Sequence, residues 1–296
     1  MDTQLDLSGK VLHVEKMMRE SKYLFFRLLP WFVMKKLKSF IREDQINALH
    51  QKTKEKQGIE YVYALLEELN IQVYIHHAER VENADRCIFV ANHPLGGVDA
   101  LSFLKSIHQL KGEVVSPSNN FFSYVPNLRP LIVGVNVFGR NTRQQTDAIN
   151  QVFLSDKQIM IFPAGLVSRK INGKMQDTPW QKSFVSKAIQ TQRFVVPVFI
   201  SGQNSPVFNL IYKIRKMMGI GIPLEAARLP AELFLKKGSD IHLIFGDPLP
   251  PDFFDRTKTP LEWAKYVREM VYKLDQEHVL QTPETASAQR SVVSIQ

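Results

Sequence analysis

The chain has 296 residues, 44% of them hydrophobic and 23% charged, which is ordinary for a soluble globular protein with one large α/β domain or two small ones. Its one cysteine, Cys87, excludes an intramolecular disulfide, and its polar N-terminus does not resemble a secretory signal, so we expect an intracellular protein. The formal net charge of +9 calls for a polyanionic neighbour, either nucleic acid or an anionic membrane surface.

Residues 15–42 mix positive charge with large apolar side chains. The basic residues are Lys16, Arg19, Lys22, Arg27, Lys35, Lys36, Lys38 and Arg42, against only Glu15 and Glu20. Arg27 and Pro30 interrupt the longest apolar stretch, which falls short of the ~20 residues needed to cross a bilayer. We expect a helical region to about Phe40, broken near Pro30, that lies in an anionic membrane interface. The alternative is a helical hairpin on the core; nucleic acid ranks below both, since no recognition motif accompanies the charge.

Beyond this segment, the apolar pattern alternates between helices and strands. A helix is expected over 44–69, where Tyr61, Leu65, Leu66 and Leu69 share one face. Short apolar runs predict strands over 71–75, 88–91, 113–115, 131–137, 158–162, 194–200 and 241–246. Helices are expected over 100–110, 146–154, 181–192 and 260–279, and an irregular loop or lid over 116–130.

Near-continuous apolar strands that alternate with helices predict an α/β fold. Its mainly parallel central sheet would be covered by helices on both faces and preceded by the N-terminal amphipathic helical segment. We place that membrane-interface segment at 1–70, the main domain at 71–280 and a disordered, Ser/Thr/Gln-rich tail at 281–296. In such sheets, active groups collect in the loops just past the strand ends. His93, Arg140 and the loop over 163–169 all fall there.

One of these loops places a histidine near a carboxylate. His93 follows an apolar strand, and Pro94 keeps it out of a helix, since the residue before a proline prefers extended geometry. Gly96 and Gly97 permit a tight reversal before Asp99 opens the next helical segment. We expect His93 and Asp99 to face each other, because a carboxylate holds an imidazole in one tautomer and keeps it basic enough to accept a hydroxyl proton. The alternative is that His93 caps the strand and Asp99 caps the helix.

Turn residues and cations follow two other strands. Pro163 and Gly165 fix a loop whose backbone N–H groups can face an anion, and Arg169 adds positive charge. A turn with solvated cations is the alternative. Arg140 follows the strand over 131–137 and either grips a phosphate or carboxylate or forms a surface ion pair. No metal site is expected, because no Cys/His spacing of the zinc type exists.

Four short sequence blocks occur in order along the chain. They are His-Pro-Leu-Gly-Gly-Val-Asp at 93–99, Phe-Gly-Arg at 138–140, Ile-Phe-Pro-Ala-Gly at 161–165 and Val-Val-Pro-Val at 195–198. In order and spacing they resemble the four blocks of the glycerolipid acyltransferase family, the lysophospholipid acyltransferases, which includes 1-acylglycerol-3-phosphate acyltransferases. The resemblance covers roughly 74–200, and we place the end of the domain near 241–248.

This resemblance implies an acyltransferase domain over 71–280 and a mechanism. His93 would be the general base that deprotonates the acceptor hydroxyl, oriented by Asp99. The acceptor oxygen would attack the thioester of an acyl-carrier protein (ACP) or coenzyme A (CoA), with no acyl-enzyme intermediate. Arg140, Gly165 and Arg169 would hold the anionic part of the acceptor. The residues expected to line the acyl chain or support the site are Asn92, Pro94, Gly96, Gly97, Phe162, Pro163, Val196 and Pro197. No cofactor is implied beyond the thioester co-substrate.

Two features depart from the family pattern. The family usually has four residues between the histidine and the aspartate, whereas this chain has five, at 94–98. This variant resembles a subgroup that includes ornithine- and glycine-lipid O-acyltransferases and hemolysin-like proteins. The third block often has a glutamate, thought to contact the acceptor's hydroxyl or glycerol part, where this chain has Ala164. Its absence disfavours acceptors of the glycerol 3-phosphate type.

The sequence therefore predicts a peripheral membrane O-acyltransferase on the cytoplasmic face. It would move a fatty acyl chain from acyl-ACP or acyl-CoA to the hydroxyl of a lyso-aminolipid or lysophospholipid. Two alternatives stay open: a lysophosphatidic acid acyltransferase that makes phosphatidic acid, and a non-enzymatic basic membrane-binding protein on the same scaffold. Hydrolysis is disfavoured because no serine sits in a Gly-x-Ser-x-Gly frame, and no nucleic acid partner is expected.

Overall fold

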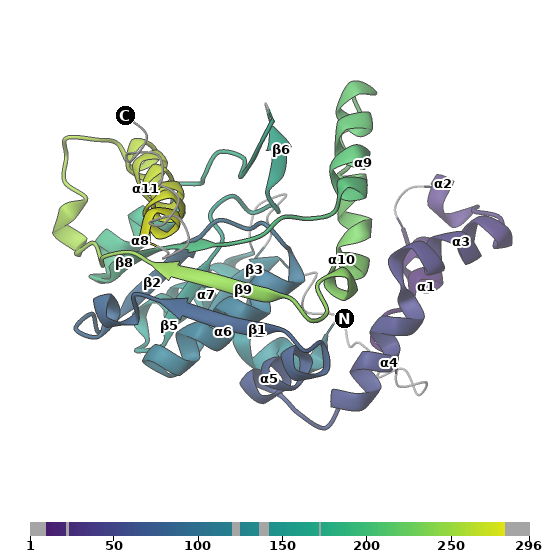
Figure 1. Cartoon of the computed structure of the whole chain (residues 1–296), viewed down its shortest axis with the longest axis horizontal. Helices are drawn as coiled ribbons and strands as arrows, with labels where there is room; N and C mark the ends of the chain where they lie inside the picture. The colour runs from purple at the N-terminus through teal and green to yellow at the C-terminus, as the bar shows by residue number, and fades with distance from the viewer. Residues whose placement is uncertain (1–9, 22–23, 120–124, 136–141, 172, 282–296) are drawn as a thin grey trace, which may run out of the picture.

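The structure, a computed structural model, describes residues 10–21, 24–119, 125–135, 142–171 and 173–281. Its centre is a sheet of seven strands in the order β1-β9-β8-β2-β5-β3-β4 (Figure 1). The strands are β1 (Gln72–His76), β2 (Cys87–Ala91), β3 (Val114–Asn119), β4 (Ile132–Val135), β5 (Gln158–Ile161), β8 (Phe194–Ile200) and β9 (Asp240–Phe245). Within this sheet β8 and β9 pair antiparallel, and the other neighbours pair parallel. The predicted α/β fold with a mainly parallel sheet is confirmed.

Helices precede, connect and follow these strands. The N-terminal helices are α1 (Val14–Arg19), α2 (Leu24–Arg27), α3 (Trp31–Ile41), α4 (Glu43–Thr53) and α5 (Gly58–Glu68). The later ones are α6 (Gly97–Lys111), α7 (Arg143–Leu154), α8 (Ser183–Thr191), α9 (Pro206–Met217), α10 (Leu229–Leu235) and α11 (Pro260–Gln281). Short 3-10 helices are η1 (Ala78–Val81), η3 (Pro126–Leu131), η4 (Leu224–Arg228) and η5 (Pro251–Phe253). A separate antiparallel hairpin joins β6 (Arg169–Ile171) to β7 (Lys174–Gln176).

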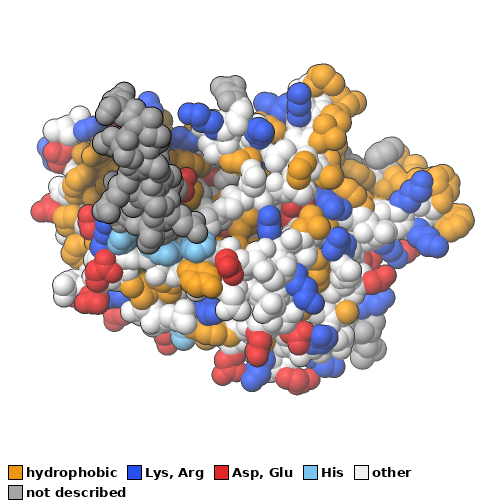
Figure 2. Space-filling model, viewed as in Figure 1, with side chains coloured by type: hydrophobic (Ala, Val, Ile, Leu, Met, Phe, Trp, Pro, Cys, Tyr) orange, Lys and Arg blue, Asp and Glu red, His pale blue; other side chains and the backbone are white. Residues whose placement is uncertain are grey.

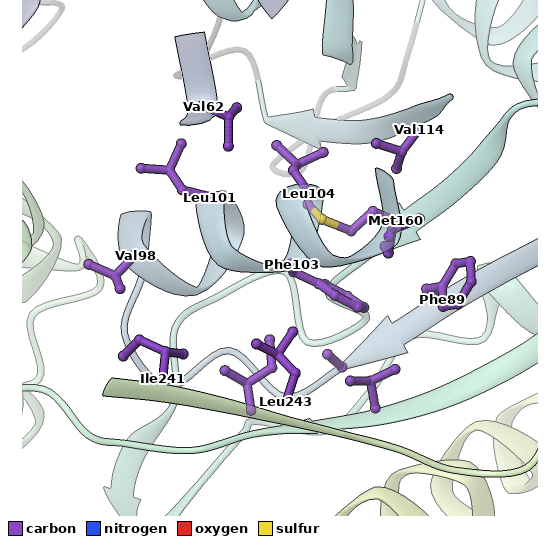
Figure 3. Close-up of a cluster of buried hydrophobic side chains, with 14 of the residues drawn as sticks. Val62, Phe89, Val98, Leu101, Phe103, Leu104, Val114, Met160, Ile241 and Leu243 are labelled. Atoms are coloured by element: carbon purple, nitrogen blue, oxygen red, sulfur yellow. The ribbon is translucent and has the colours of Figure 1, made fainter. Parts of the chain in front are cut away.

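Strand β2 shows how both faces of the sheet are covered. All its residues are buried, and they alternate: Cys87 and Phe89 join one hydrophobic core, whereas Ile88 and Val90 join another. The first core packs the sheet against α5 and α6 (Figure 3), and the second packs it against α7, α8 and α11. A strand buried on both faces is apolar at every position, which explains the unbroken apolar run. Burial also raises the pKa of the Cys87 thiol to about 12, so Cys87 serves as a small, unreactive core residue.

Some predicted boundaries are wrong. The helix expected over 44–69 is two helices, α4 and α5, because the chain turns at 54–57 and Gly58 takes a φ of +57°. The loop expected over 116–130 contains the end of β3 and most of η3. The hairpin β6–β7 and the helices α9 and α10 are not among the predicted elements.

The N-terminal segment is helical and broken where predicted. Helix α2 ends at Arg27, and α3 begins at Trp31, directly after Pro30. A small core of Val14, Met34 and Ile41 joins α1 to α3. Among the residues that the structure describes, no helix is both long and apolar enough to cross a membrane. The predicted boundaries between segment, domain and tail stay predictions, and the tail beyond Gln281 lies outside the described residues.

Candidate active site

His93 lies just past the carboxyl end of β2, in the middle of the sheet. Its ring nitrogen Nδ1 is 3.0 Å from Oδ1 of Asp99, whose side chain is fully buried. The other carboxylate oxygen, Oδ2, accepts a hydrogen bond of 2.7 Å from the backbone N–H of Leu95. One carboxylate thus closes the turn and also faces the imidazole, as the spacing predicts. The catalytic roles of the two residues stay a prediction at this point.

The plane of the His93 ring is set by an aromatic neighbour. The ring stacks on Phe162 with centroids 3.9 Å apart and planes 14° apart. Phe162 directly follows β5, so the end of the neighbouring strand supplies the wall behind the imidazole. With Nδ1 facing Asp99, the nitrogen that can act on a substrate is Nε2. Such an imidazole is held in place before a substrate arrives, which is what general-base catalysis requires.

The two glycines of the loop have different roles. Gly96 takes φ +76°, a conformation that side chains disfavour, and a Cβ there would lie 2.9 Å from Leu229 Cδ2 of α10. Gly97 begins α6 and has more room, since its Cβ would lie 3.7 Å from Leu233. The extra residue between His93 and Asp99 is therefore accommodated by a positive-φ turn packed against α10.

Two further links join the histidine loop to its neighbours. The Asn92 side chain donates to the backbone carbonyl of Ile200 at 2.9 Å and accepts from its N–H at 2.7 Å. This ties the end of β2 to the end of β8. Ser168 donates its backbone N–H to the His93 carbonyl at 2.6 Å, which brings the loop around Gly165 (φ +66°) beside the histidine. Pro94, next to His93, is buried.

Asp177 is a residue of this site that the sequence interpretation misses. Its carboxylate accepts hydrogen bonds from the His93 backbone N–H at 3.2 Å, from the Ser168 hydroxyl and from Trp180 Nε1 at 2.8 Å. Burial raises the pKa of Asp177 above its ordinary value, although the hydrogen bonds from Ser168 and Trp180 oppose that rise. Asp177 is thus a positioning residue for the backbone of His93. It stands in a polar stretch without any motif, so no local signal marks it.

Replacement of Asp177 by alanine should lower the free energy of unfolding by about 2–4 kcal/mol, because three donors lose their partner inside the protein. Urea denaturation of the variant measures this loss. The matched control is Asp156→Ala, since the Asp156 side chain is fully exposed; it should be within about 0.5 kcal/mol of wild type. Equal stability of both variants would contradict the positioning role.

Arg169 is buried rather than solvated. Its guanidinium donates to Glu225 Oε1 from Nε at 3.0 Å and from Nη2 at 2.8 Å, and its side chain is only 3% exposed. Arg215 pairs with the same carboxylate at 2.7 Å. Burial alone would raise the pKa of Glu225, but hydrogen bonds from Arg215 and Arg169 outweigh it and lower that pKa. Two guanidiniums therefore share one carboxylate, and the cluster keeps excess positive charge beside the site. Contact of Arg169 with an acceptor stays a prediction.

Of the other predicted site residues, two are buried in the sheet and one lies outside the described part of the chain. Val196 lies in the hydrophobic core of the sheet, and Pro197, also buried, would be only 2.9 Å from a Cβ on Gly246. Neither is among the described residues that line the cavity beside His93. Val196 and Pro197 thus pack the sheet as structural residues, and their contact with an acyl chain stays a prediction. Arg140 lies outside the described residues.

A cavity of about 1480 Å³ opens beside His93. Its lining includes Gly96, Gly97, Phe162, Pro163, Gly165 and Arg169 from the predicted site. It extends to Lys16 and Met17 of α1 and to Leu229 of α10, so it is long enough for an extended apolar ligand. Among the described residues, no group of three His, Cys, Asp or Glu side chains is arranged to hold a metal ion. The arrangement can therefore take a proton from a hydroxyl at the edge of an elongated cavity.

Comparisons with known proteins connect this geometry to an activity. The model of a family described as Acyltransferase matches residues 16–279. The lyso-glycine lipid O-acyltransferase of Bacteroides thetaiotaomicron is 35% identical over 266 residues, which cover 89% of this chain and 97% of the relative. The lyso-glycine lipid O-acyltransferase of Phocaeicola vulgatus is 34% identical over 266 residues, which cover 89% of this chain and 95% of that relative. Among solved structures, the 1-acyl-sn-glycerophosphate acyltransferase PlsC of Thermotoga maritima is similar at 15% identity and a TM-score of 0.44, covering 82% of this chain and 95% of PlsC.

Proposed function

The chain belongs to the acyltransferase family and is an enzyme of that kind, and on this premise we propose that it acylates the hydroxyl of a lyso-glycine lipid or a closely related lyso-aminolipid. The names of the two relatives support this acceptor, because each match spans nearly the whole relative. The subgroup suggested by the five-residue spacing at 94–98 agrees with it. A long-chain thioester, acyl-ACP or acyl-CoA, is the proposed donor.

The single observation that carries the mechanism is the pairing of His93 Nδ1 with Asp99 across 3.0 Å. His93 Nε2 takes the proton of the acceptor hydroxyl while the oxygen of that hydroxyl attacks the thioester carbonyl. The new C–O bond forms as the C–S bond breaks, and the proton passes from His93 to the departing thiolate. Because the carboxyl group of Asp99 faces Nδ1 of the ring, it stabilises the imidazolium that exists between these two proton transfers.

Ala164 supports an acceptor without a glycerol 3-phosphate part. It stands where many family members have a glutamate, and it is buried in a hydrophobic core. No carboxylate is therefore present at that position to contact a glycerol hydroxyl. Lysophosphatidic acid is the second candidate acceptor, favoured by the excess positive charge of the cluster that Arg169, Arg215 and Glu225 form.

The acyl chains of the proposed acceptor and donor are both apolar, which calls for an enzyme at the membrane surface. We propose that the basic N-terminal segment docks the protein on the cytoplasmic face as a peripheral protein. The exposed side chains of Leu24 on α2, Leu28 in the turn after it and Trp31 on α3 support this, and Lys16 of α1 also lines the cavity. A lipid could then move between bilayer and cavity without crossing water.

Acyl transfer by purified protein tests the proposal. Lyso-glycine lipid, lyso-ornithine lipid and lysophosphatidic acid are offered in competition, with acyl-ACP or acyl-CoA as donor, and the products are identified by mass spectrometry. We expect the lyso-aminolipids to be acylated in preference to lysophosphatidic acid. Preference for lysophosphatidic acid would overturn the proposed acceptor. Vesicle binding without turnover of any thioester would support the non-enzymatic alternative.

A further inference from the structure

Helix α9 carries an apolar stripe on its outer face. Val207, Leu210, Ile214 and Met217 recur at helical spacing, and each is at least 43% exposed, with Met217 at 81%. Met218 and Ile222, just beyond the helix, are exposed as well. Isolated exposed apolar residues are common, but a continuous stripe of this kind marks a contact surface.

The charge around the stripe is positive. From Ser201 to Leu224 the sequence holds no Asp or Glu, whereas Lys213, Arg215 and Lys216 all lie on α9. Lys213 and Lys216 are exposed, while Arg215 points inward to Glu225. An apolar stripe with exposed lysines beside it fits the headgroup region of an anionic bilayer, where apolar side chains enter the acyl boundary and ammonium groups meet phosphate.

A second apolar surface lies on the same side of the molecule. The exposed residues there are Leu24 on α2, Leu28 in the following turn, and Trp31 and Phe32 on α3, and residues 21–42 also lack Asp and Glu. Helices α3 and α9 both pack against η4. Figure 2 shows hydrophobic side chains over α9 and over α2–α3, with Lys and Arg side chains beside them. The apolar surfaces of α9 and of α2–α3 therefore flank the short helix η4.

The inner face of α9 reaches the candidate active site. Phe208 is fully buried and lines the cavity beside His93. Tyr212 lies between two guanidiniums, with its ring 5.4 Å from Arg169 and 5.4 Å from Arg215. Asn209 accepts a hydrogen bond of 3.1 Å from the backbone N–H of Lys170. One helix thus presents its outer face to solvent and its inner face to the cavity and to the start of β6.

We propose that α9 is a second membrane-docking element, whose stripe of Val207, Leu210, Ile214 and Met217 enters an anionic lipid surface together with α2–α3. The proposal rests on the proposed function for the choice of a membrane, rather than a protein, as the occupant of the stripe. Docking through two elements fixes the orientation of the protein, which a single helix does not. It would also place the cavity wall formed by Phe208 next to the lipid from which the acceptor comes.

Vesicle flotation of full-length Leu210→Glu/Ile214→Glu tests the apolar stripe. Vesicles of phosphatidylglycerol and phosphatidylcholine are the probe, and thermal unfolding confirms that the variant is folded. We expect binding to fall about tenfold or more, because two carboxylates would have to enter the acyl boundary. The matched control is Leu154→Glu/Leu261→Glu, which alters leucines on α7 and α11 that are at least as exposed and should bind like wild type.

A charge variant completes the test. Lys213→Gln/Lys216→Gln should weaken binding to anionic vesicles by about fivefold for each lysine removed and leave binding to pure phosphatidylcholine unchanged. The proposal is overturned if the double glutamate variant binds vesicles like wild type. It is also overturned if that variant splits a wild-type dimer in gel filtration without loss of vesicle binding, since the stripe would then be an interface between copies. Vesicle binding through α9 by a protein that acylates no lyso-lipid would instead refute the proposed function alone.

Discussion

Replacement of His93 by alanine should lower the rate of acyl transfer by about 10²–10⁴-fold, because no other described group takes the hydroxyl proton at that position. The substitution removes a ring that stacks on Phe162 and belongs to neither large hydrophobic core. We therefore expect the variant to fold and to unfold close to the wild-type temperature. Turnover of acyl-ACP or acyl-CoA with a lyso-lipid measures the loss.

His108→Ala is a suitable control for this experiment. His108 lies in the last turn of α6, is partly buried and contacts an aromatic ring, that of Tyr63. It does not line the cavity formed by the described residues, so its loss should leave the rate of acyl transfer near wild type. If His93→Ala retains wild-type turnover while remaining folded, the imidazole is not the base and the proposed mechanism is wrong.

Asp99→Asn should also abolish most activity, by about 10²–10⁴-fold, while keeping the shape of the loop. The asparagine oxygen can still accept the Leu95 N–H that now binds Oδ2. Its NH₂ group then faces Nδ1 of His93 as a donor, so Nδ1 must act as an acceptor and the ring proton moves to Nε2. A protonated Nε2 donates hydrogen bonds but does not accept the hydroxyl proton.

Thermal unfolding separates this tautomer effect from simple loss of structure. Asp99→Asn keeps an acceptor for the Leu95 N–H, so it should unfold close to the wild-type temperature while its rate of acyl transfer falls. A variant that is merely destabilised would lose activity together with a lower unfolding temperature. Asp156→Asn, at an exposed position, is the control and should leave both the rate and the unfolding temperature unchanged. Full activity of Asp99→Asn would refute the assigned orientation of His93.

The parts of this protein that could be predicted from sequence are those with local signals. Cys87–Ala91 is apolar at every position because both its faces are buried, and that pattern is visible without any partner. The approach of His93 to Asp99 follows from a proline and two glycines within the same loop. In both cases the residues that decide the structure are neighbours in the chain.

The parts that could not be predicted depend on distant partners. Asp177 meets the His93 backbone across 84 positions, and Arg169 meets Glu225 across 56. Nothing near Arg169 indicates that its charge will be buried. The exposure of the apolar stripe on α9 could likewise not be predicted from the sequence, since an apolar stripe at helical spacing most often packs on the core. Only the fold shows that this stripe has no partner among the described residues.

The pairing of β1 with β9 has a consequence for the order of events during synthesis. Gln72 of β1 lies beside Asp240 of β9, and β9 is far along the chain. Strand β9 is therefore among the last parts of the sheet to leave the ribosome. Helices α2 and α3, with the exposed Leu24 and Trp31, emerge long before it. Long-range parallel pairing is slow to form, whereas a short amphipathic helix forms early. With α2 and α3 as the proposed docking element, the nascent chain would meet the bilayer before β9 completes the sheet, and the enzyme would finish folding where its lipid is found.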